Sequence, residues 1–471
     1  RSSPSPRPSP PVGEREKTCA LLVFLLLSLT LLSACQKKPA PADADLSIYF
    51  TCDTRGRLVP CGCFTGQYGG LTRLKTVLDA DTSTNSLRVD VGDVIAGRED
   101  FEFIQYKYLL RAYGLMGFDA LNIGHREAQL SAAQLRQARK DSPVPLLSAN
   151  LLDKQTSKPL FDAYRLVKRN GRTIALVGVL DPRGLGENLG EGLGVEKMEV
   201  ALARLLPELR AKADLVVLLA FTDETTLAAL AREFYELDVV LGGKVSQPSQ
   251  QLGRENRAVI LHVTNESRAL GILKAKFAGK AKLTDVTHEI MLMREDIPQH
   301  DAIAALAKEY RDEVRTARLA VDDPKHLEAN SIPGVRAAAT FAGTETCIVC
   351  HKTATDIWKK TGHADAFATL SQRKADADPN CIGCHTVGFG SASGYRREFA
   401  GKKLADVGCE SCHGPGSLHV EQHRAKLPIT FKFRPLGAGD CRKCHHGEFS
   451  RPFDWEVFWP HIKHGKEPGG K

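Results

Sequence analysis

Residues 409–413 read Cys-Glu-Ser-Cys-His, and the pattern Cys-x-x-Cys-His also occurs at residues 347–351, 381–385 and 441–445. We number these stretches the first to fourth motifs in chain order, so that 409–413 is the third. Two thiols three positions apart on a helical turn can both add to the vinyl groups of one haem, and the histidine that follows then lies under the iron. The pattern therefore predicts covalently bound c-type haems.

A zinc half-site or a redox dithiol can share the Cys-x-x-Cys spacing, but neither explains why all four motifs carry histidine in the fifth place. We therefore expect four c-type haems. The expected thioether cysteines are Cys347, Cys350, Cys381, Cys384, Cys409, Cys412, Cys441 and Cys444, and the expected proximal iron ligands are His351, His385, His413 and His445.

A second, distal ligand for each iron would come from another histidine of the same region. The candidates are His363, His419, His423, His461 and His464. His464 is favoured over His461, and His446 is expected to face solvent because it directly follows a proximal ligand. The sequence leaves open which haem each distal histidine serves.

The region 341–471 contains few long apolar runs and many Gly, Lys and Asp residues. A chain of this composition struggles to bury enough apolar surface by itself, so closely packed haems would supply the missing core. All three tryptophans, Trp358, Trp455 and Trp459, fall in this region. Packing against porphyrins and packing in an ordinary core both account for them. We expect a mostly α-helical and irregular multihaem cytochrome c domain.

Two stretches of this region resemble the cytochrome c554 family of multihaem proteins. One runs from Phe341 through the first motif to Trp358-Lys-Lys-Thr-Gly-His-Ala364, and the other is Val407-Gly-Cys-Glu-Ser-Cys-His-Gly-Pro-Gly416, followed by His419. The likeness covers about residues 341–464. It implies that most irons have a distal histidine, with His363 and His419 the best matched, and that one iron can keep an open position.

The N-terminus predicts export. Arg15 and Lys17 precede an apolar stretch that is shorter than the about 20 residues of a spanning helix and is typical of a signal-peptide core. Leu32-Ser-Ala-Cys35 resembles a bacterial lipoprotein cleavage site, which implies a lipid on the Cys35 thiol. A plain signal peptide or an uncleaved anchor is the alternative. We expect a signal peptide at 1–34, a tether at 35–45, and a membrane-anchored lipoprotein in the periplasm or at the cell surface.

From residue 46 to about residue 295, apolar strand-like runs alternate with helical patterns. The clearest strands are at 46–51, 87–91, 174–180 and 215–220, and the clearest helices are at 71–78, 101–116, 200–213 and 225–235. Continuous apolar strands flanked by helices predict a sheet covered on both faces. We expect consecutive antiparallel strands over 258–293, one helix over 297–319, and domains at 46–295, 296–340 (helix and linker) and 341–471.

Motifs within residues 46–280 resemble the metallophosphoesterase domain of the periplasmic 5′-nucleotidase family. They are Ile48-Tyr-Phe-Thr-Cys-Asp-Thr-Arg-Gly56, Gly69-Gly-Leu-Thr-Arg73, Val89-Asp-Val-Gly-Asp93, Leu115-Met-Gly-Phe-Asp-Ala-Leu-Asn-Ile-Gly124 and Leu146-Leu-Ser-Ala-Asn150. The resemblance implies a four-layer α/β/β/α sandwich. It also implies catalysis by two metal ions, held by Asp, His and Asn, that activate water against a phosphoryl centre.

Most of the implied metal ligands are replaced. Asp53 and Asp93 are retained, and His125 stands where the family has Asn. The other ligand positions carry Arg55, Phe221, Lys244 and Ser246, which are not normal ligands of divalent metals. Arg126 stands where the family has its catalytic histidine. The sequence predicts a pseudoenzyme with a vestigial metal site at Asp53, Asp93 and His125. The two carboxylates are expected to cap loops or to pair with Arg55 and Arg126, and Lys244 is expected at the surface.

Three further cysteines lie near the mouth of this ancestral site, since Cys52 adjoins Asp53 and Cys61 and Cys63 follow soon after. One interpretation is a structural disulfide, as is usual outside the cytoplasm, which leaves one thiol unpaired. The other is a redox or soft-metal thiol site that exchanges electrons with the haems.

The leading hypothesis is an exported, lipid-anchored tetrahaem electron carrier of a respiratory or extracellular electron-transfer chain. Its expected partners are cytochromes or quinol-linked complexes and, through the lipid, a membrane. The net charge of +8 is not gathered in a patch of the nucleic-acid-binding kind. The second hypothesis is an oxidoreductase that acts on a small nitrogen or sulfur compound at an open haem or at the three cysteines. The third is a residual metal-dependent phosphoesterase.

Overall fold

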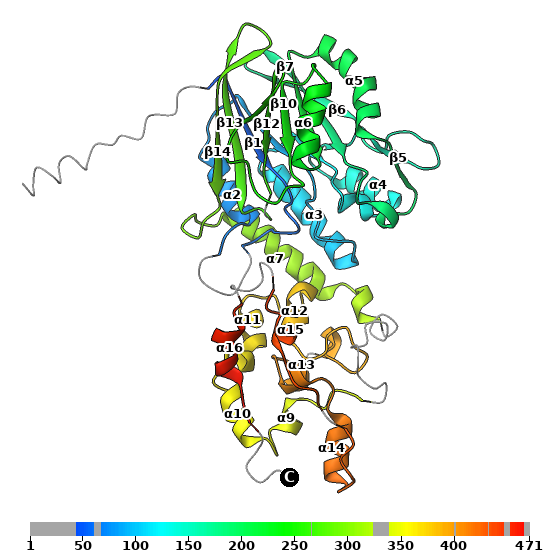
Figure 1. The fold of residues 1–471 in the computed structure, drawn as a ribbon, viewed down its shortest axis with the longest axis vertical. Coiled ribbons are helices and arrows are strands. Elements are labelled where there is room, and N and C mark those ends of the chain that lie inside the picture. The colour runs from blue at the N-terminus through cyan, green and yellow to red at the C-terminus, as the bar shows by residue number, and fades with distance from the viewer. Residues whose placement is uncertain are drawn as a thin grey trace, which may run out of the picture. The chain divides into compact units, whose positions relative to one another are not determined.

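The structure is a computed structural model that describes residues 44–60, 67–264, 266–323, 339–399, 402–431, 433–446 and 453–465 (Figure 1). The predicted signal peptide, Cys35 and nearly all of the predicted tether lie outside the described residues, as do Cys61 and Cys63. Within the described residues, no helix combines the length and the apolar character that crossing a bilayer requires.

Two six-stranded sheets form the first half of the chain. The strand order of the first sheet is β14-β13-β1-β2-β3-β4, and that of the second is β11-β12-β10-β9-β7-β6. The first sheet contains β1 (Leu46–Thr51), β2 (Ser86–Asp90), β3 (Ala120–Asn122), β4 (Leu146–Leu147), β13 (Ala269–Ala278) and β14 (Lys282–Leu292). The second contains β6 (Tyr164–Arg169), β7 (Arg172–Leu180), β9 (Leu215–Phe221), β10 (Val239–Gly242), β11 (Gly253–Glu255) and β12 (Ala258–His262). Two short strands, β5 (Leu151–Asp153) and β8 (Leu193–Val195), pair separately.

Strand β9 shows why the sheets stack. Its alternate residues Leu215, Val217 and Leu219 belong to a core shared with the first sheet. The residues between them, Val216 and Leu218 among others, belong to a second core with helices α5 (Met198–Lys212) and α6 (Glu224–Glu233). Because side chains alternate across a strand, an unbroken apolar strand is buried on both faces, as the sequence predicts.

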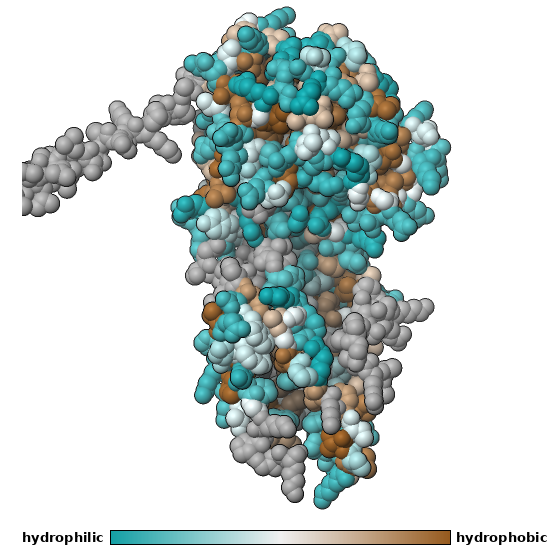
Figure 2. All heavy atoms as spheres, in the orientation of Figure 1, coloured by the Kyte–Doolittle hydropathy of each residue, from teal (hydrophilic) through white to brown (hydrophobic). Residues whose placement is uncertain are grey.

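Helices cover the outer faces of the two sheets. Helices α2 (Leu71–Asp79), α3 (Asp100–Leu115) and α7 (Asp301–Thr316) pack with the first sheet, and α5 and α6 pack on the second. Helix α4 (Ala132–Asp141) follows β3. The layers run helix, sheet, sheet, helix, which confirms the predicted four-layer sandwich. Hydrophilic side chains cover most of its visible face in Figure 2, since the apolar ones are buried between the layers.

The prediction for residues 258–293 is wrong for its first strand. Strand β12 runs parallel to β10 in the second sheet, whereas β13 and β14 form an antiparallel hairpin in the first. The chain therefore crosses between the sheets after β12. The sequence of an apolar strand does not indicate which sheet it joins, because both sheets bury their central strands. The helix expected at 297–319 is α7, and it packs against α2 and α3.

Short helices and irregular segments make up the haem-motif region. They are α9 (Thr344–Cys347), α10 (Lys352–Trp358), α11 (Ala366–Gln372), α12 (Pro379–His385), α13 (Cys409–His413), α14 (Ser417–Arg424), α15 (Ala438–Cys441) and α16 (Trp455–Ile462). The apolar core of its described residues is small, with Leu370, Ala375, Ile382 and Tyr395 as its buried members. This agrees with the expectation that the polypeptide supplies little core of its own.

Candidate functional site

Each of the four motifs folds as one helical turn. The second motif ends α12 and the third motif forms α13. In the first motif the turn closes through the amide of His351, which donates to the carbonyl of Cys347 at 3.1 Å. The fourth motif repeats this bond between His445 and Cys441 at 2.8 Å. In every motif the two cysteines and the histidine therefore share one turn, as haem attachment requires.

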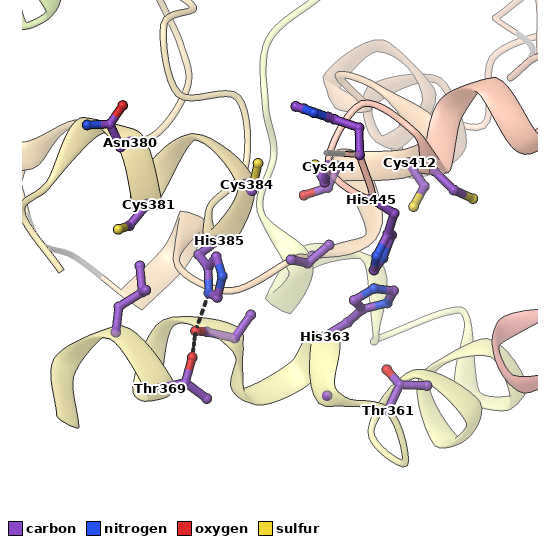
Figure 3. Close-up of a pocket in the computed structure, with 18 of the residues that line it drawn as sticks. Thr361, His363, Thr369, Asn380, Cys381, Cys384, His385, Cys412, Cys444 and His445 are labelled. Atoms are coloured by element: carbon purple, nitrogen blue, oxygen red, sulfur yellow. Dashed lines mark hydrogen bonds between the residues drawn. The ribbon is translucent and has the colours of Figure 1, made fainter. Parts of the chain in front are cut away.

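A cavity of about 1080 Å³ lies among the four motifs. Its lining includes the histidine of every motif and all the motif cysteines except Cys350. Protein interiors hold few voids larger than a water molecule, so a cavity of this size surrounded by thiols and imidazoles fits a large non-protein group. The residue types and the space both fit c-type haem. Figure 3 shows one part of this cavity, with the second and fourth motifs and His363 around it.

Three of the four motif histidines face a second histidine. The ring centroids of His351 and His419 are 6.1 Å apart, those of His413 and His464 are 5.7 Å apart, and those of His445 and His363 are 6.0 Å apart. With a metal–nitrogen bond of about 2 Å, two imidazoles on opposite sides of one ion place their centroids about 6 Å apart. Each pair joins one expected proximal ligand to one expected distal ligand.

The remaining motif histidine, His385 of the second motif, has a different environment. Its Nδ1 lies 2.6 Å from the carbonyl oxygen of Ala366, and the hydroxyl of Thr369 also donates to that oxygen, at 2.7 Å (Figure 3). A bond from Nδ1–H to a carbonyl fixes the tautomer and leaves Nε2 for a metal. Within the described part of the chain, no second imidazole faces His385 at the separation seen in the three pairs.

The remaining histidines do not form such pairs in the described residues. The ring of His423 lies 4.4 Å from that of His419, which leaves no room for an iron between them. His461 and His446 are exposed. The structure thus brings His363, His419 and His464 to motif histidines, and it leaves His423 and His461 apart from them.

Burial lowers the pKa of His363, His413 and His419, and neighbouring histidines lower it further. These imidazoles are therefore neutral near pH 7, and neutral imidazole is the form that binds metals.

The motifs also lie next to one another in a fixed order. The thiols of Cys347 and Cys409 lie close enough to shift each other's pKa, which places the first motif beside the third. The thiols of Cys384 and Cys444 are related in the same way, which places the second motif beside the fourth. Cys412 and Cys441 are close enough to interact electrostatically. The motifs therefore follow the spatial order first, third, fourth, second.

In the sandwich, arginines pair with the two retained carboxylates. The Arg55 Nε lies 2.5 Å from the Asp53 Oδ1, and the Arg126 Nε lies 3.7 Å from the Asp93 Oδ2. The predicted pairs are therefore present. Asp53 and Asp93 have φ values of 57° and 59°. Such strained backbone persists where the surrounding structure imposes it, commonly at functional sites.

The third member of the predicted vestigial site points elsewhere. The His125 Nε2 lies 2.6 Å from the carbonyl oxygen of Asp181, and its ring packs edge-on against Phe221. Lys244 is exposed, as predicted, and its Nζ donates to the carbonyl of Arg183 at 3.1 Å. The described residues contain no group of three or more His, Cys, Asp or Glu that could hold a metal ion. The donor set of this site does not fit the two metal ions that its fold implies.

Cys52 belongs to the core and not to an accessible thiol site. Its side chain is 2% exposed, and its thiol donates to the Gly92 carbonyl at 3.5 Å. Burial raises the pKa of the thiol well above its ordinary value, and the nearby carboxylate of Asp90 raises it further. A protonated, buried thiol is a poor nucleophile and a poor metal ligand. The predicted cluster with Cys61 and Cys63 lies outside the described residues and stays a prediction.

The haem region contains a buried carboxylate that its sequence motifs do not single out. Glu410, inside the third motif, is 3% exposed. The other motifs carry Ile-Val, Ile-Gly and Arg-Lys between their cysteines, so an acidic residue with a small neighbour was the available signal.

Fold and site together define a protein with two parts, a metallophosphoesterase-like sandwich and a region built to hold c-type haem. Residues 346–414 match the family model described as cytochrome c554 and c-prime. Cytochrome c-554 of Nitrosomonas europaea is 41% identical over 103 residues, which cover 19% of this chain and 44% of that protein. The C-terminal part is therefore a cytochrome c554 domain, fused to a 5′-nucleotidase-like domain.

The sandwich has its own relatives. The 5′-nucleotidase of Vibrio cholerae is 27% identical over 248 residues, covering 46% of this chain and 44% of that protein. The structure of sulfate thiohydrolase SoxB from Thermus thermophilus, in complex with glycerol, has a TM-score of 0.53 and 19% identity, over 58% of this chain and 61% of that one. The structural likeness establishes the fold. The chain spans less than half the length of the two curated relatives, cytochrome c-554 of Nitrosomonas europaea and the 5′-nucleotidase of Vibrio cholerae.

Proposed function

We propose that this protein is an exported, lipid-anchored tetrahaem cytochrome that passes electrons between redox proteins of a respiratory or extracellular chain. Its cytochrome c554 domain makes it a haem-based electron carrier. The observation that carries the finer proposal is the arrangement of the motifs, because four haem anchors lie side by side and three of them face a second histidine.

Bound haem supplies the one-electron chemistry. The chain supplies two things. Paired imidazoles from separate segments of the chain would keep an iron six-coordinate in both oxidation states, so little would have to reorganise when an electron arrives. The contacts between motifs, first with third, third with fourth and fourth with second, place neighbouring sites within a few side chains of each other.

Export and anchoring follow from the lipoprotein-like N-terminus, Leu32-Ser-Ala-Cys35. Attachment of haem to Cys-x-x-Cys-His motifs outside the cytoplasm is consistent with export. In this proposal the sandwich serves as a docking or sensing module, and the redox partners are cytochromes or quinol-linked complexes.

One observation favours a second candidate function. His385 has its Nδ1 bonded to Ala366, and no described imidazole faces it at an axial separation. An iron held there would keep one position free for a small nitrogen or sulfur compound. Oxidoreductase activity at the second motif would use this free position. The cysteine cluster gives this candidate less support, since Cys52 is buried.

The hydrolase candidate has the least support. The guanidinium of Arg55 pairs with the carboxylate of Asp53, and that of Arg126 pairs with the carboxylate of Asp93. Two guanidinium groups at the carboxylates repel the divalent cations that phosphoesterase chemistry of this fold needs.

Electron counting tests the proposed function. Purified protein from a host that exports and matures c-type cytochromes should take up four electrons per chain in an anaerobic reductive titration. Its intact mass should exceed that of the cleaved and lipidated polypeptide by four haems. The double variant Cys381→Ser/Cys384→Ser should lose one haem and one electron and keep the other three. Wild-type protein that is colourless, or that takes up no electrons, would contradict the proposal.

A further inference from the structure

A single buried carboxylate joins three separate segments of the haem region. The Glu410 Oε1 accepts hydrogen bonds from the amides of Ala342 at 2.8 Å and Gly416 at 2.7 Å, and its Oε2 accepts one from the amide of Gly343 at 2.7 Å. All three partners are N–H donors, which matches the acceptor-only character of an ionised carboxylate. Hydrogen bonds to a charged acceptor are roughly twice as strong as neutral ones.

The three segments carry different parts of the haem sites. Ala342 and Gly343 lead into α9, which begins the first motif, and Gly416 is the N-cap of α14, which carries His419. Glu410 itself lies on α13, in the third motif. A Cβ at Gly416 would lie 3.3 Å from the Glu410 Oε1, so glycine lets this backbone approach the carboxylate closely.

The first and third motifs meet at this point. A Cβ at Gly408 would lie 2.1 Å from the Thr344 Oγ1, so the start of α13 is in close contact with the start of α9. The thiols of Cys347 and Cys409 also lie close enough to shift each other's pKa. Glu410 is thus held where the anchors of two haems adjoin, and with 3% exposure it has little access to water that could replace its bonds.

We infer that Glu410 is a positioning residue of the third motif that sets the His351–His419 pair of the first haem. Its bond to Gly416 fixes the start of α14, three residues before His419, and its bonds to Ala342 and Gly343 fix the approach to the first motif. Its buried negative charge also favours the more positive, oxidised iron and keeps the reduction potentials of the first and third haems low. This inference rests on the proposed function, since it requires haems at these motifs.

The test uses the full-length haem-loaded protein and three variants. Glu410→Gln keeps the shape but removes the charge and turns one acceptor into a donor that faces a backbone N–H. Glu410→Asp keeps the charge but shortens the reach. Glu421→Gln on α14 is the control, because it removes the same charge from an exposed position on the helix that carries His419. Electron paramagnetic resonance reads each low-spin iron, and a spectroelectrochemical titration reads each potential.

We expect Glu410→Gln to shift the low-spin signal of the first haem, which is assigned by its loss in His419→Ala, while the signals of the other two pairs stay in place. At a fixed ambient potential, the ratio of reduced to oxidised first haem should rise about tenfold, which is about 59 mV for one electron. Glu410→Asp should disturb the same signal with a smaller change of potential. Glu421→Gln should match wild type.

Two outcomes would overturn the inference. In one, both Glu410 variants keep the wild-type signal and potential of the first haem. In the other, every haem signal changes together, which would mark Glu410 as a general folding residue. If Glu410→Gln does not mature, Glu410→Asp decides by the same criteria. Wild-type protein without low-spin haem signals would instead refute the proposed function, so the two failures are distinguishable.

Discussion

Replacing His464 by alanine is expected to turn one low-spin haem iron into a high-spin iron and to leave the other haems unchanged. The reason is that the His464 ring faces the motif histidine His413 at 5.7 Å, so its loss opens one axial position. His419→Ala and His363→Ala should each have the same effect on a different haem, because they face His351 and His445. Low-temperature electron paramagnetic resonance of the oxidised protein measures the change.

The chain offers matched controls for this series. His461 lies three residues from His464 and is exposed as His464 is, and His423 lies on α14 with His419. In the described residues neither His461 nor His423 faces a motif histidine as His464 faces His413. His461→Ala and His423→Ala should leave every low-spin signal in place. If His461→Ala removes a signal and His464→Ala does not, the assignment of the third haem is wrong.

Withholding haem is expected to unfold the cytochrome domain while the sandwich stays folded. The apolar cluster of the described haem region has only four buried members, whereas both faces of the second sheet are buried in extensive apolar cores. Its cavity of about 1080 Å³ would have no filling. A region that buries so little apolar surface cannot offset its conformational entropy.

Hydrogen–deuterium exchange followed by mass spectrometry measures this effect. Full-length chain made in the cytoplasm of a host without haem attachment should lose amide protection throughout residues 341–465. Peptides from β7, β9 and β10 should keep the protection that they have in the haem-loaded protein, and they serve as the internal control. Equal protection of the cytochrome domain with and without haem would show that the polypeptide has a sufficient core of its own.

Features that depend on local sequence were predictable. The haem anchors need only a thiol spacing within one helical turn, and β7 and β9 show as unbroken apolar runs because they are buried on both faces. The pairing of Asp53 with Arg55 was also predictable, since the two residues are two positions apart in one loop. In each case the partners lie close together along the chain.

Features that depend on tertiary contacts were not predictable. His363 faces His445 across 82 positions of the sequence, and no local pattern selects that partner. The pattern of apolar residues does not indicate that the chain crosses from β12 to the first sheet. His125 turns to the carbonyl of Asp181 and not toward the retained carboxylates, because its ring packs against the residue that replaced a ligand, Phe221.

The four motifs are expected to hold four haem irons, three of them between paired imidazoles and the one at His385 with an open position. Electron paramagnetic resonance of the fully oxidised wild-type protein, before and after addition of nitric oxide, tests this expectation most directly. The expected spectrum contains three low-spin irons and one high-spin iron per chain, and nitric oxide should change the high-spin signal alone. Four low-spin irons that ignore nitric oxide would contradict the open position, and a sample with no haem signal would contradict the whole account.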